Sequence, residues 1–496
     1  MNYSFYYDET EHSRKITYNT VSASNYYDFF TAVIVGWNEN DENDIINKYL
    51  EVEEKYDYRK KDGELKSDSI KKNDFKLGFA SLNKNTITFY EELLSFYDEK
   101  ILLYISCFSK LEYLIGQILN NYENSIMFDA DAMKYSIVKA INVYQPEKLL
   151  SSIYSNPKDF TKELKNFLQN RIAENEKNID LKKRENTAFE QILMVLENVE
   201  SVEEFEWQYS EPFKGFQQML LEGGISSYRL AVDNESKTCN TAIEVGIQNV
   251  REEDSISCVG VRIADMMAGF LSRFMQILCL QLRANYSNGV ISKTLLDSGW
   301  FVLNERQFQL YKKLYKIVCE YNNFWYKTYL GYYADDLVAF ISLLQFINHF
   351  NTVDELKNEE IKMLPEYYNS FVCEQLGKRY SRMRNKLPIE FIGDNNCDYF
   401  INDRGAAVYY DEEKQPLLYI DFDEKIYEVL SVGVIKNHAP LITIKENETA
   451  ACYRLPNELL DWAIDVVALS NIGGKFFPAT MAFSLNNEKY NIRIIE

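Results

Sequence analysis

One apolar stretch constrains the fold of this chain more than any other, because it contains a single acidic residue. Residues 257–269 read SCVGVRIADMMAG, and the acid is Asp265. We interpret the stretch as a short buried strand over 257–261 that turns directly into a helix. A lone carboxylate in such surroundings is costly to bury unless a charged group or metal ion pairs with it. The sequence therefore predicts a partner for Asp265.

The length and net charge limit the classes of protein to consider. A chain of 496 residues exceeds what one hydrophobic core usually supports, so we expect two or three domains. The formal net charge of −21 argues against a bulk attraction to nucleic acid or to an anionic membrane. An enzyme acting on nucleic acid would need a local basic groove or metal ions to offset this charge.

The cysteine pattern and the apolar runs predict a reduced cytoplasmic protein. None of the eight cysteines forms a pair with the two-residue spacing typical of zinc or redox motifs. The N-terminus has no basic region followed by an apolar run, so no signal peptide is expected. We also find no apolar stretch long enough to suggest a membrane span.

Short apolar strands and longer helical patterns divide the chain into regions. We expect a hairpin over 3–19, a strand over 29–37 and a helix over 42–56. A strand at 228–233 and the strand at 257–261 complete the expected sheet. The residues between these groups follow helical periodicity, including the apolar positions from 101 to 118.

The predicted architecture is an α/β fold with a mixed sheet and several additions. Residues 1–280 form the core, with a large helical insertion at about 76–222. Residues 281–387 form a helical region. Residues 388–496 form a C-terminal α+β module, because short strand patterns and turn signals alternate there.

Four acids stand at the ends of strands or at the start of an element: Asp8, Glu64, Asp233 and Asp265. Strand ends in one sheet lie about 5 Å apart, and carboxylates gathered there repel one another unless cations neutralise them. Two Mg²⁺ or Mn²⁺ ions would meet that need and can promote phosphoryl transfer. The plainer interpretation is that each acid is an ordinary turn residue.

Four short motifs carry a resemblance to a known family. They are YYDET at 6–10, ELKS at 64–67, VD at 232–233 and IADMMAG at 263–269, with Arg273 beyond. This pattern resembles the bacterial family called domain of unknown function 3800. That family has a similar Asp-Glu-Ser start, a Glu-Leu-Lys/His motif, a strand-end Asp and an Ala-Asp-x-x-Ala-Gly motif. The resemblance covers about residues 1–75 and 225–275.

The resemblance implies a ribonuclease-H-like or retroviral-integrase-like fold, with a mixed sheet flanked by helices. It also implies that Asp8, Glu64, Asp233 and Asp265 are catalytic metal ligands. Arg262 stands where the family often has Gln. That arginine could bind a phosphate, or it could neutralise Asp265 and leave the site inert.

Two further features bear on the site. Glu9 adjoins Asp8 and could support the ligands, although an exposed acid is the plainer interpretation. The basic stretch 378–386 holds Arg379, Arg382 and Arg384, which could contact a nucleic-acid backbone. A helix end or an interdomain contact is the alternative interpretation of this stretch.

We therefore expect a metal-dependent nuclease that hydrolyses phosphodiesters in DNA or RNA. The resemblance suits a role in phage defence or in conflict with mobile elements. The competing hypothesis is a non-catalytic sensor or adaptor that binds a protein partner in a defence or toxin system. The net charge, Arg262 and the large aromatic helical regions favour this second hypothesis.

Overall fold

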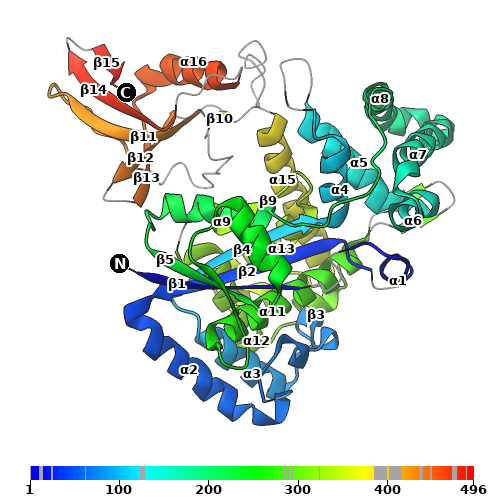
Figure 1. Cartoon of the computed structure of the whole chain (residues 1–496), viewed down its shortest axis with the longest axis horizontal. Helices are drawn as coiled ribbons and strands as arrows, with labels where there is room; N and C mark the ends of the chain where they lie inside the picture. Colours follow the sequence, from blue (N-terminus) through cyan, green and yellow to red (C-terminus); the bar gives the residue numbers. More distant parts are fainter. Residues whose placement is uncertain are drawn as a thin grey trace.

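The computed structural model describes residues 2–10, 15–23, 26–61, 63–122, 124, 129–283, 285–287, 290–292, 294–322, 324–384, 399–401, 416–434, 440–446, 449–471, 477–486 and 489–495. Within these residues the protein has a central mixed sheet, a second antiparallel sheet and many helices (Figure 1). The predicted α/β class is confirmed at this level.

The central sheet carries the candidate acids. Its strand order is β6-β5-β1-β2-β4-β9. The strands are β1 (Tyr3–Thr10), β2 (Phe29–Asn38), β4 (Leu102–Ser109), β5 (Tyr228–Asp233), β6 (Val250–Glu253) and β9 (Thr328–Leu330). β1 is antiparallel to β2 and β2 to β4, whereas β5 is parallel to β1 and β6 to β5. The carboxyl ends of β1, β5 and β6 therefore lie along one edge of the sheet.

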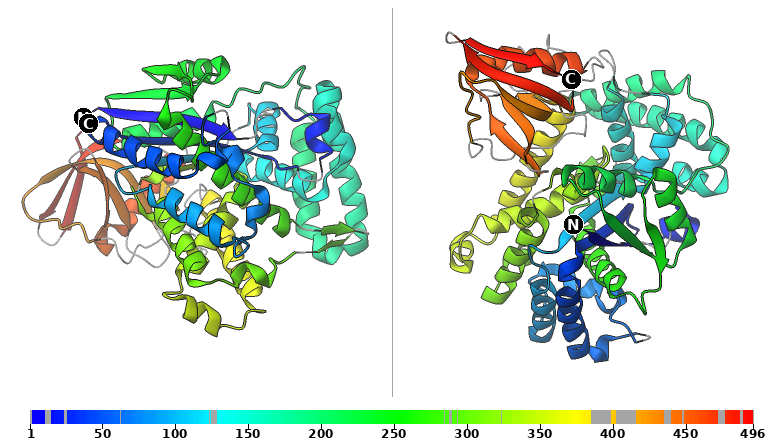
Figure 2. Two further views of the ribbon diagram at one scale, coloured as in Figure 1. Left: turned by 90° about the horizontal axis from the view of Figure 1, so that it is seen from below. Right: turned by 60° about the vertical axis from the view of Figure 1, so that its left-hand side comes forward.

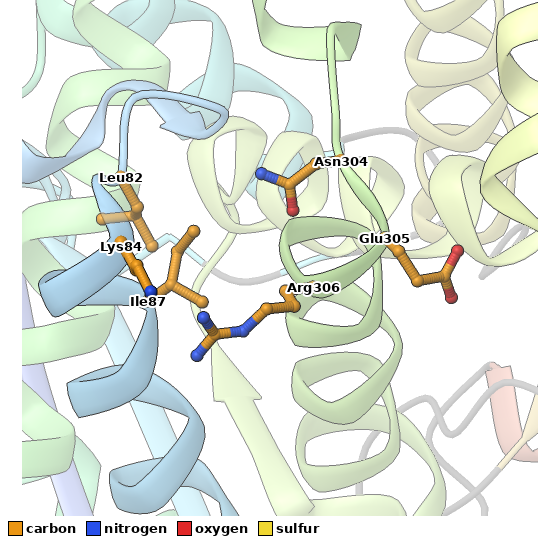
Figure 3. A pocket seen from close by; sticks show the side chains of 6 residues that line it. All are labelled: Leu82, Lys84, Ile87, Asn304, Glu305 and Arg306. Carbon is orange, nitrogen blue, oxygen red and sulfur yellow. The ribbon is translucent and has the colours of Figure 1, made fainter.

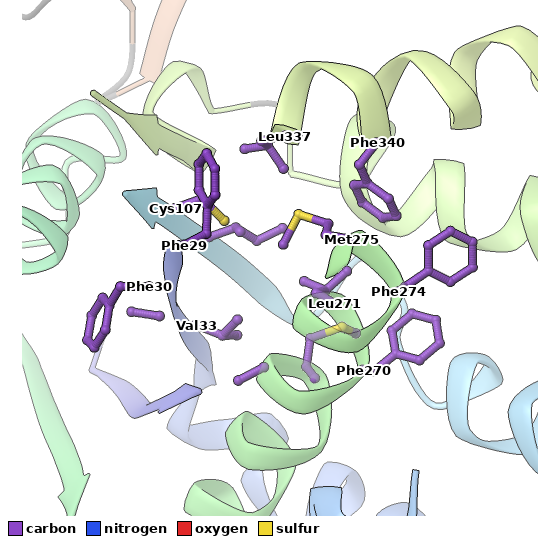
Figure 4. Close-up of a cluster of buried hydrophobic side chains, with 14 of the residues drawn as sticks. Phe29, Phe30, Val33, Cys107, Phe270, Leu271, Phe274, Met275, Leu337 and Phe340 are labelled. Atoms are coloured by element: carbon purple, nitrogen blue, oxygen red, sulfur yellow. The ribbon is translucent and has the colours of Figure 1, made fainter. Parts of the chain in front are cut away.

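Helix α11 (Val259–Leu282) forms the core on one face of this sheet. It packs against β1 and β2, and its Phe274 ring lies 5.5 Å from Phe340 of α13 (Asp335–Asn348), while Met275 points toward Phe29 of β2 (Figure 4). The helix is long and apolar enough to cross a membrane, but 72% of its most apolar window is buried inside the fold. Packing in the interior of the fold accounts for that composition.

Helix α9 (Glu211–Glu222) covers the opposite face of the sheet. Its Phe216 ring lies 5.0 Å from Phe5, and its Phe213 ring stacks 4.9 Å from Tyr7. The alternation of side chains along β1 produces this division, because Phe5 and Tyr7 point to one face and Tyr6 and Asp8 to the other. Helices on both faces therefore bury the sheet.

The predicted helical regions are present on either side of these core elements (Figure 2). Besides α9, the helices before β5 are α1 (Tyr18–Val21), α2 (Glu42–Lys55), α3 (Lys84–Ser95), α4 (Lys110–Ile118), α5 (Ala130–Tyr144), α6 (Glu147–Ser155), α7 (Phe160–Asn175) and α8 (Ile179–Leu196). Those after it include α10 (Ser236–Val245), α12 (Glu305–Tyr315), α14 (Val353–Asn358) and α15 (Leu364–Arg384). Strand β9 also lies in this second region and extends the central sheet beside β4.

The C-terminal part forms its own sheet and its own hydrophobic cluster, as the sequence predicts. The strand order is β13-β12-β11-β14-β15, and β10 also pairs with β11. These strands are β10 (Tyr399–Ile401), β11 (Lys425–Val434), β12 (Leu441–Glu446), β13 (Thr449–Arg454), β14 (Ala479–Asn486) and β15 (Lys489–Ile494). Helix α16 (Leu460–Asn471) packs on β11. The predicted boundary at residue 388 lies outside the described residues.

Three local predictions are wrong. Residues 102–109, predicted within a helical region, form strand β4, which is buried along its whole length. The strand predicted at 257–261 lies earlier, at β6, and helix α11 has already begun at Val259. The second strand of the predicted hairpin, expected to run to residue 19, is also wrong at its end, because helix α1 begins at Tyr18 with Thr17 as its N-cap. Residues 11–14, which would join the two strands, lie outside the described residues.

Candidate functional site

Asp8 and Asp233 lie next to each other at the carboxyl edge of the sheet. β1 and β5 run parallel with Tyr7 opposite Val232, so the next residue on each strand is an aspartate. Neighbouring strands are about 4.8 Å apart. Glu253, at the end of β6, pairs with Asp233 and extends this row of acids. Sequence analysis missed Glu253 because it placed the strand several residues too late.

Asp265 faces Asp8 from helix α11. Tyr6 and Asp8 point to the face of β1 that α11 covers, and Gly260 brings the start of the helix against Tyr6. A Cβ atom at Gly260 would lie 2.3 Å from the Tyr6 ring, so a larger residue would push the helix away. This close approach places Asp265, one and a half turns further along α11, near the end of β1.

Electrostatic repulsion between these acids is visible in their pKa values. Burial raises the pKa of Asp8 well above its ordinary value, and the charge of Asp265 adds to this effect. Asp233 and Glu9 raise the pKa of Asp8 further, whereas a hydrogen bond of 2.6 Å from the Glu9 N–H to Asp8 Oδ1 lowers it. A cation at this position would relieve the repulsion.

The loop that follows Glu64 holds Asp265 in place. The Ser67 N–H donates a hydrogen bond of 2.8 Å to Asp265 Oδ2. Burial raises the pKa of Asp265, while Ser67 and the positive charge of Arg273 lower it. Gly269 permits the loop to lie against α11, since a Cβ atom there would be 2.2 Å from Ser67 Cβ. The ELKS and IADMMAG motifs are therefore in direct contact.

Glu64 is buried, with 2% of its surface exposed, in the same loop. Neither of its carboxylate oxygens has a hydrogen-bond partner among the described residues. Lys66 Nζ lies 3.6 Å from Oε1, at the distance of a loose ion pair. Buried carboxylates are costly without partners, so Glu64 is suited to accept a cation.

Arg262 points away from Asp265 and pairs with Glu53 of α2. Its Nε lies 3.1 Å from Glu53 Oε1, and its Nη1 donates to the carbonyl oxygens of Ser255 and Ile256. Glu53 Oε1 also accepts a hydrogen bond of 3.1 Å from the N–H of Leu65. The arginine therefore joins α11 to α2 and to the Glu64 loop.

The remaining predicted residues lie elsewhere. Glu9 points to the α9 face, where its carboxylate accepts a hydrogen bond from the Tyr7 hydroxyl. Arg379, on α15, donates a hydrogen bond of 2.8 Å to the Gly331 carbonyl. Burial raises the pKa of Glu112 to about 8, and the charge of Arg379 opposes this rise. Arg382 and Arg384 belong to the last turn of the same helix, and their side chains lie outside the described residues.

Glu53 is the most informative residue that sequence analysis missed. It is 4% exposed, although it is charged. The sequence could have indicated this residue by its position, because Glu53 shares the apolar face of α2 with Ile45, Tyr49 and Val52. An acid on an apolar helix face indicates a buried partner.

Two further observations concern the metal-binding geometry and the location of the candidate site. Among the described residues, no three acidic, histidine or cysteine side chains are arranged closely enough to hold a metal ion as they stand. A surface pocket of about 390 Å³ between α3 and α12 shares no residue with the acids, and Figure 3 shows Arg306 directed toward Ile87 there. The candidate site is thus the carboxyl edge of the sheet, built from Asp8, Asp233 and Asp265 with Glu64 in the adjoining loop.

Comparisons of the chain with models of protein families, with curated protein sequences and with solved structures return no significant match.

Proposed function

We propose that this protein is a metal-dependent nuclease with a ribonuclease-H-like core. The observation that carries the proposal is that Asp8 and Asp233 follow paired residues at the ends of two adjacent parallel strands. Burial, and then the charges of Asp265 and Asp233, raise the pKa of Asp8 there. Acids that meet at the carboxyl edge of a sheet are suited to bind divalent ions. The antiparallel run β1-β2-β4, continued by parallel β5 and β6, supports the core assignment.

Asp8, Asp233 and Asp265 would hold Mg²⁺ or Mn²⁺, with Glu64 as a further ligand. The buried oxygens of Glu64, which have no hydrogen-bond partner among the described residues, fit this role. A bound divalent ion lowers the pKa of a coordinated water and offsets the charge of a phosphodiester. The protein contributes the orientation of the acids: the Ser67 N–H holds Asp265, and Glu53 holds the backbone next to Glu64.

One observation favours the alternative, a non-catalytic sensor or adaptor that binds a protein partner. Among the described residues, no three of the acids are arranged to hold a metal ion, so binding an ion through three of them requires side chains to move. If binding of divalent ions cannot be detected, the alternative becomes the better proposal.

The test is cleavage of labelled single- and double-stranded DNA and RNA with Mg²⁺, Mn²⁺ or EDTA. Wild type is compared with Asp265→Asn, which keeps an oxygen to accept the Ser67 hydrogen bond. Asp354→Asn is the matched control, because the Asp354 side chain is 86% exposed and far from the sheet edge in sequence. We expect cleavage that EDTA and Asp265→Asn abolish and that Asp354→Asn leaves unchanged. Cleavage that survives Asp265→Asn would contradict the proposed site.

A further inference from the structure

A second cavity lies between the helical regions, apart from the sheet edge. Its volume is about 580 Å³, within the range of small-molecule sites. It is bounded by the segment before β2 and by residues of α5, α8, α11, α13 and α15. No candidate nuclease residue lines it. A ligand in this cavity would therefore bind independently of the proposed nuclease site.

One wall of the cavity is a continuous series of aromatic rings. The Tyr27 and Phe29 rings lie 5.5 Å apart, and Phe29 lies 5.9 Å from Tyr333. Tyr333 in turn lies 5.8 Å from Tyr135. The faces of such rings carry negative charge density and attract cations.

Three of the four acids that line the cavity are satisfied by the protein. Asp28 accepts hydrogen bonds from Ser109, Tyr26 and Leu111, and Glu185 accepts them from Tyr144, Asn175 and Lys182. Asp335 forms an ion pair with Lys139 and accepts hydrogen bonds from the hydroxyls of Tyr135 and Tyr380.

The fourth acid, Asp336, lines the cavity next to Asp335 and forms no ion pair within 4 Å with the described residues. The Cys279 thiol, a weak donor, hydrogen-bonds to its side chain. The two cations of the cavity are already engaged. Lys139 pairs with Asp335, and Arg283 donates a hydrogen bond of 3.0 Å to the Tyr26 carbonyl. A buried carboxyl group whose side chain has only a weak thiol donor can still accept a stronger, charged partner.

We propose that this cavity binds a small organic amine, whose ammonium group pairs with Asp336 and whose body lies against the aromatic wall. An anionic ligand is disfavoured, because four acids and two engaged cations line the space. Burial and the charge of Asp335 raise the pKa of Asp336 to about 7, while the charges of Lys139 and Arg283 oppose this rise. The Lys139 side chain is 43% exposed, so the cavity is open to solvent beside it.

The test uses pairs of probes that differ only in charge: phenethylamine with 2-phenylethanol, and tryptamine with tryptophol. Binding to the full chain is measured by calorimetry and by thermal shift. We expect at least one amine to bind about tenfold more tightly than its alcohol. Asp336→Asn preserves the shape of the side chain and should reduce amine binding to the level of the alcohol.

A second variant covers the case in which Asp336→Asn disturbs the fold. Ala188→Phe places a ring in the cavity from α8 and should abolish binding of amine and alcohol alike, while the circular dichroism spectrum is retained. Exposed Asp354→Asn should bind as wild type does. Equal affinity for amine and alcohol, unchanged amine binding in Asp336→Asn, or no binding of either amine at millimolar concentration would overturn the proposal.

Discussion

Arg262 and Glu53 form a two-point ion pair between α11 and α2, with Nη2 to Oε2 at 3.2 Å and Nε to Oε1 at 3.1 Å. Both side chains are buried. Because Glu53 also accepts the Leu65 N–H, this one pair fixes the loop that carries Glu64. The arginine therefore supports the acidic site without neutralising it.

Removing one member of this pair should be strongly destabilising. Arg262→Ala leaves the Glu53 charge buried without its partner, and we expect a loss of about 3–5 kcal/mol in the free energy of unfolding. Urea denaturation measures it. The double variant Glu53→Leu, Arg262→Met should recover part of that loss, because no unpaired charge remains.

The control for this prediction is the exposed pair of Arg493 and Glu424, whose side chains are 67% and 44% exposed. Arg493→Ala should change stability by less than about 1 kcal/mol. A similar small effect for Arg262→Ala would contradict a structural role for the buried pair.

Gly269→Ala should displace the Ser67 loop from Asp265. The added Cβ would lie 2.2 Å from Ser67 Cβ and 2.4 Å from Arg273 Nη1, so the loop must move. We expect a destabilisation of about 1–3 kcal/mol, typical of overpacking, together with weaker nuclease activity. Thermal denaturation and the cleavage assay measure both effects.

Gly377 on α15 offers a matched control, because a Cβ there meets nothing within 4 Å. Gly377→Ala should be neutral or stabilising by up to about 1 kcal/mol, since alanine favours helix. If both substitutions changed the thermal stability by the same amount, the close contact between Gly269 and Ser67 would not contribute to stability.

The sequence predicts two of the three strand-end acids, because Asp8 and Asp233 each follow a short apolar run with the pattern of a strand. Asp8 and Asp233 are positioned by that pattern alone. Strand β4 is a different case. Both of its faces are buried, so the alternation that marks a half-exposed strand is lost and the apolar run resembles a helix.

The sequence could not predict contacts between segments that lie far apart in the chain. The partner of Arg262 lies on another helix, and nothing local distinguishes a pairing with Glu53 from one with Asp265. The cavity around Asp336 is likewise assembled from segments far apart in the chain. Tertiary packing decides both.

Divalent ions should stabilise the wild type and not Asp8→Asn. The acids repel one another without a cation, so Mn²⁺ should raise the melting temperature measured in EDTA-treated protein. In EDTA, Asp8→Asn should be at least as stable as wild type, because one repelling charge is removed. An equal Mn²⁺ shift in both proteins would mean that the ion binds elsewhere.

Asp336→Asn should make the stability of the protein less dependent on pH. The folded state raises the pKa of Asp336 to about 7, so it favours the neutral carboxyl. The stability linked to this group is fully present below about pH 4 and is lost as the pH rises through about 7. At pH 8, Asp336→Asn should therefore be more stable than wild type, by on the order of 1–2 kcal/mol.

Urea denaturation across this pH range measures the difference between the two proteins. It should vanish near pH 4, where both side chains are neutral. A constant difference at every pH would assign the effect to packing and not to ionisation.

The C-terminal module should unfold separately from the rest of the chain. Its hydrophobic cluster, which includes Val429, Ile442 and Val467, shares no residue with the cluster around α11. Separate cores unfold in separate cooperative transitions. We therefore expect two transitions by calorimetry for the full chain, and one of them should disappear when the chain ends at Arg384. The remaining transition should keep its midpoint to within about 2 °C. A single transition for the full chain, or loss of the central sheet on truncation, would show that the two cores depend on each other.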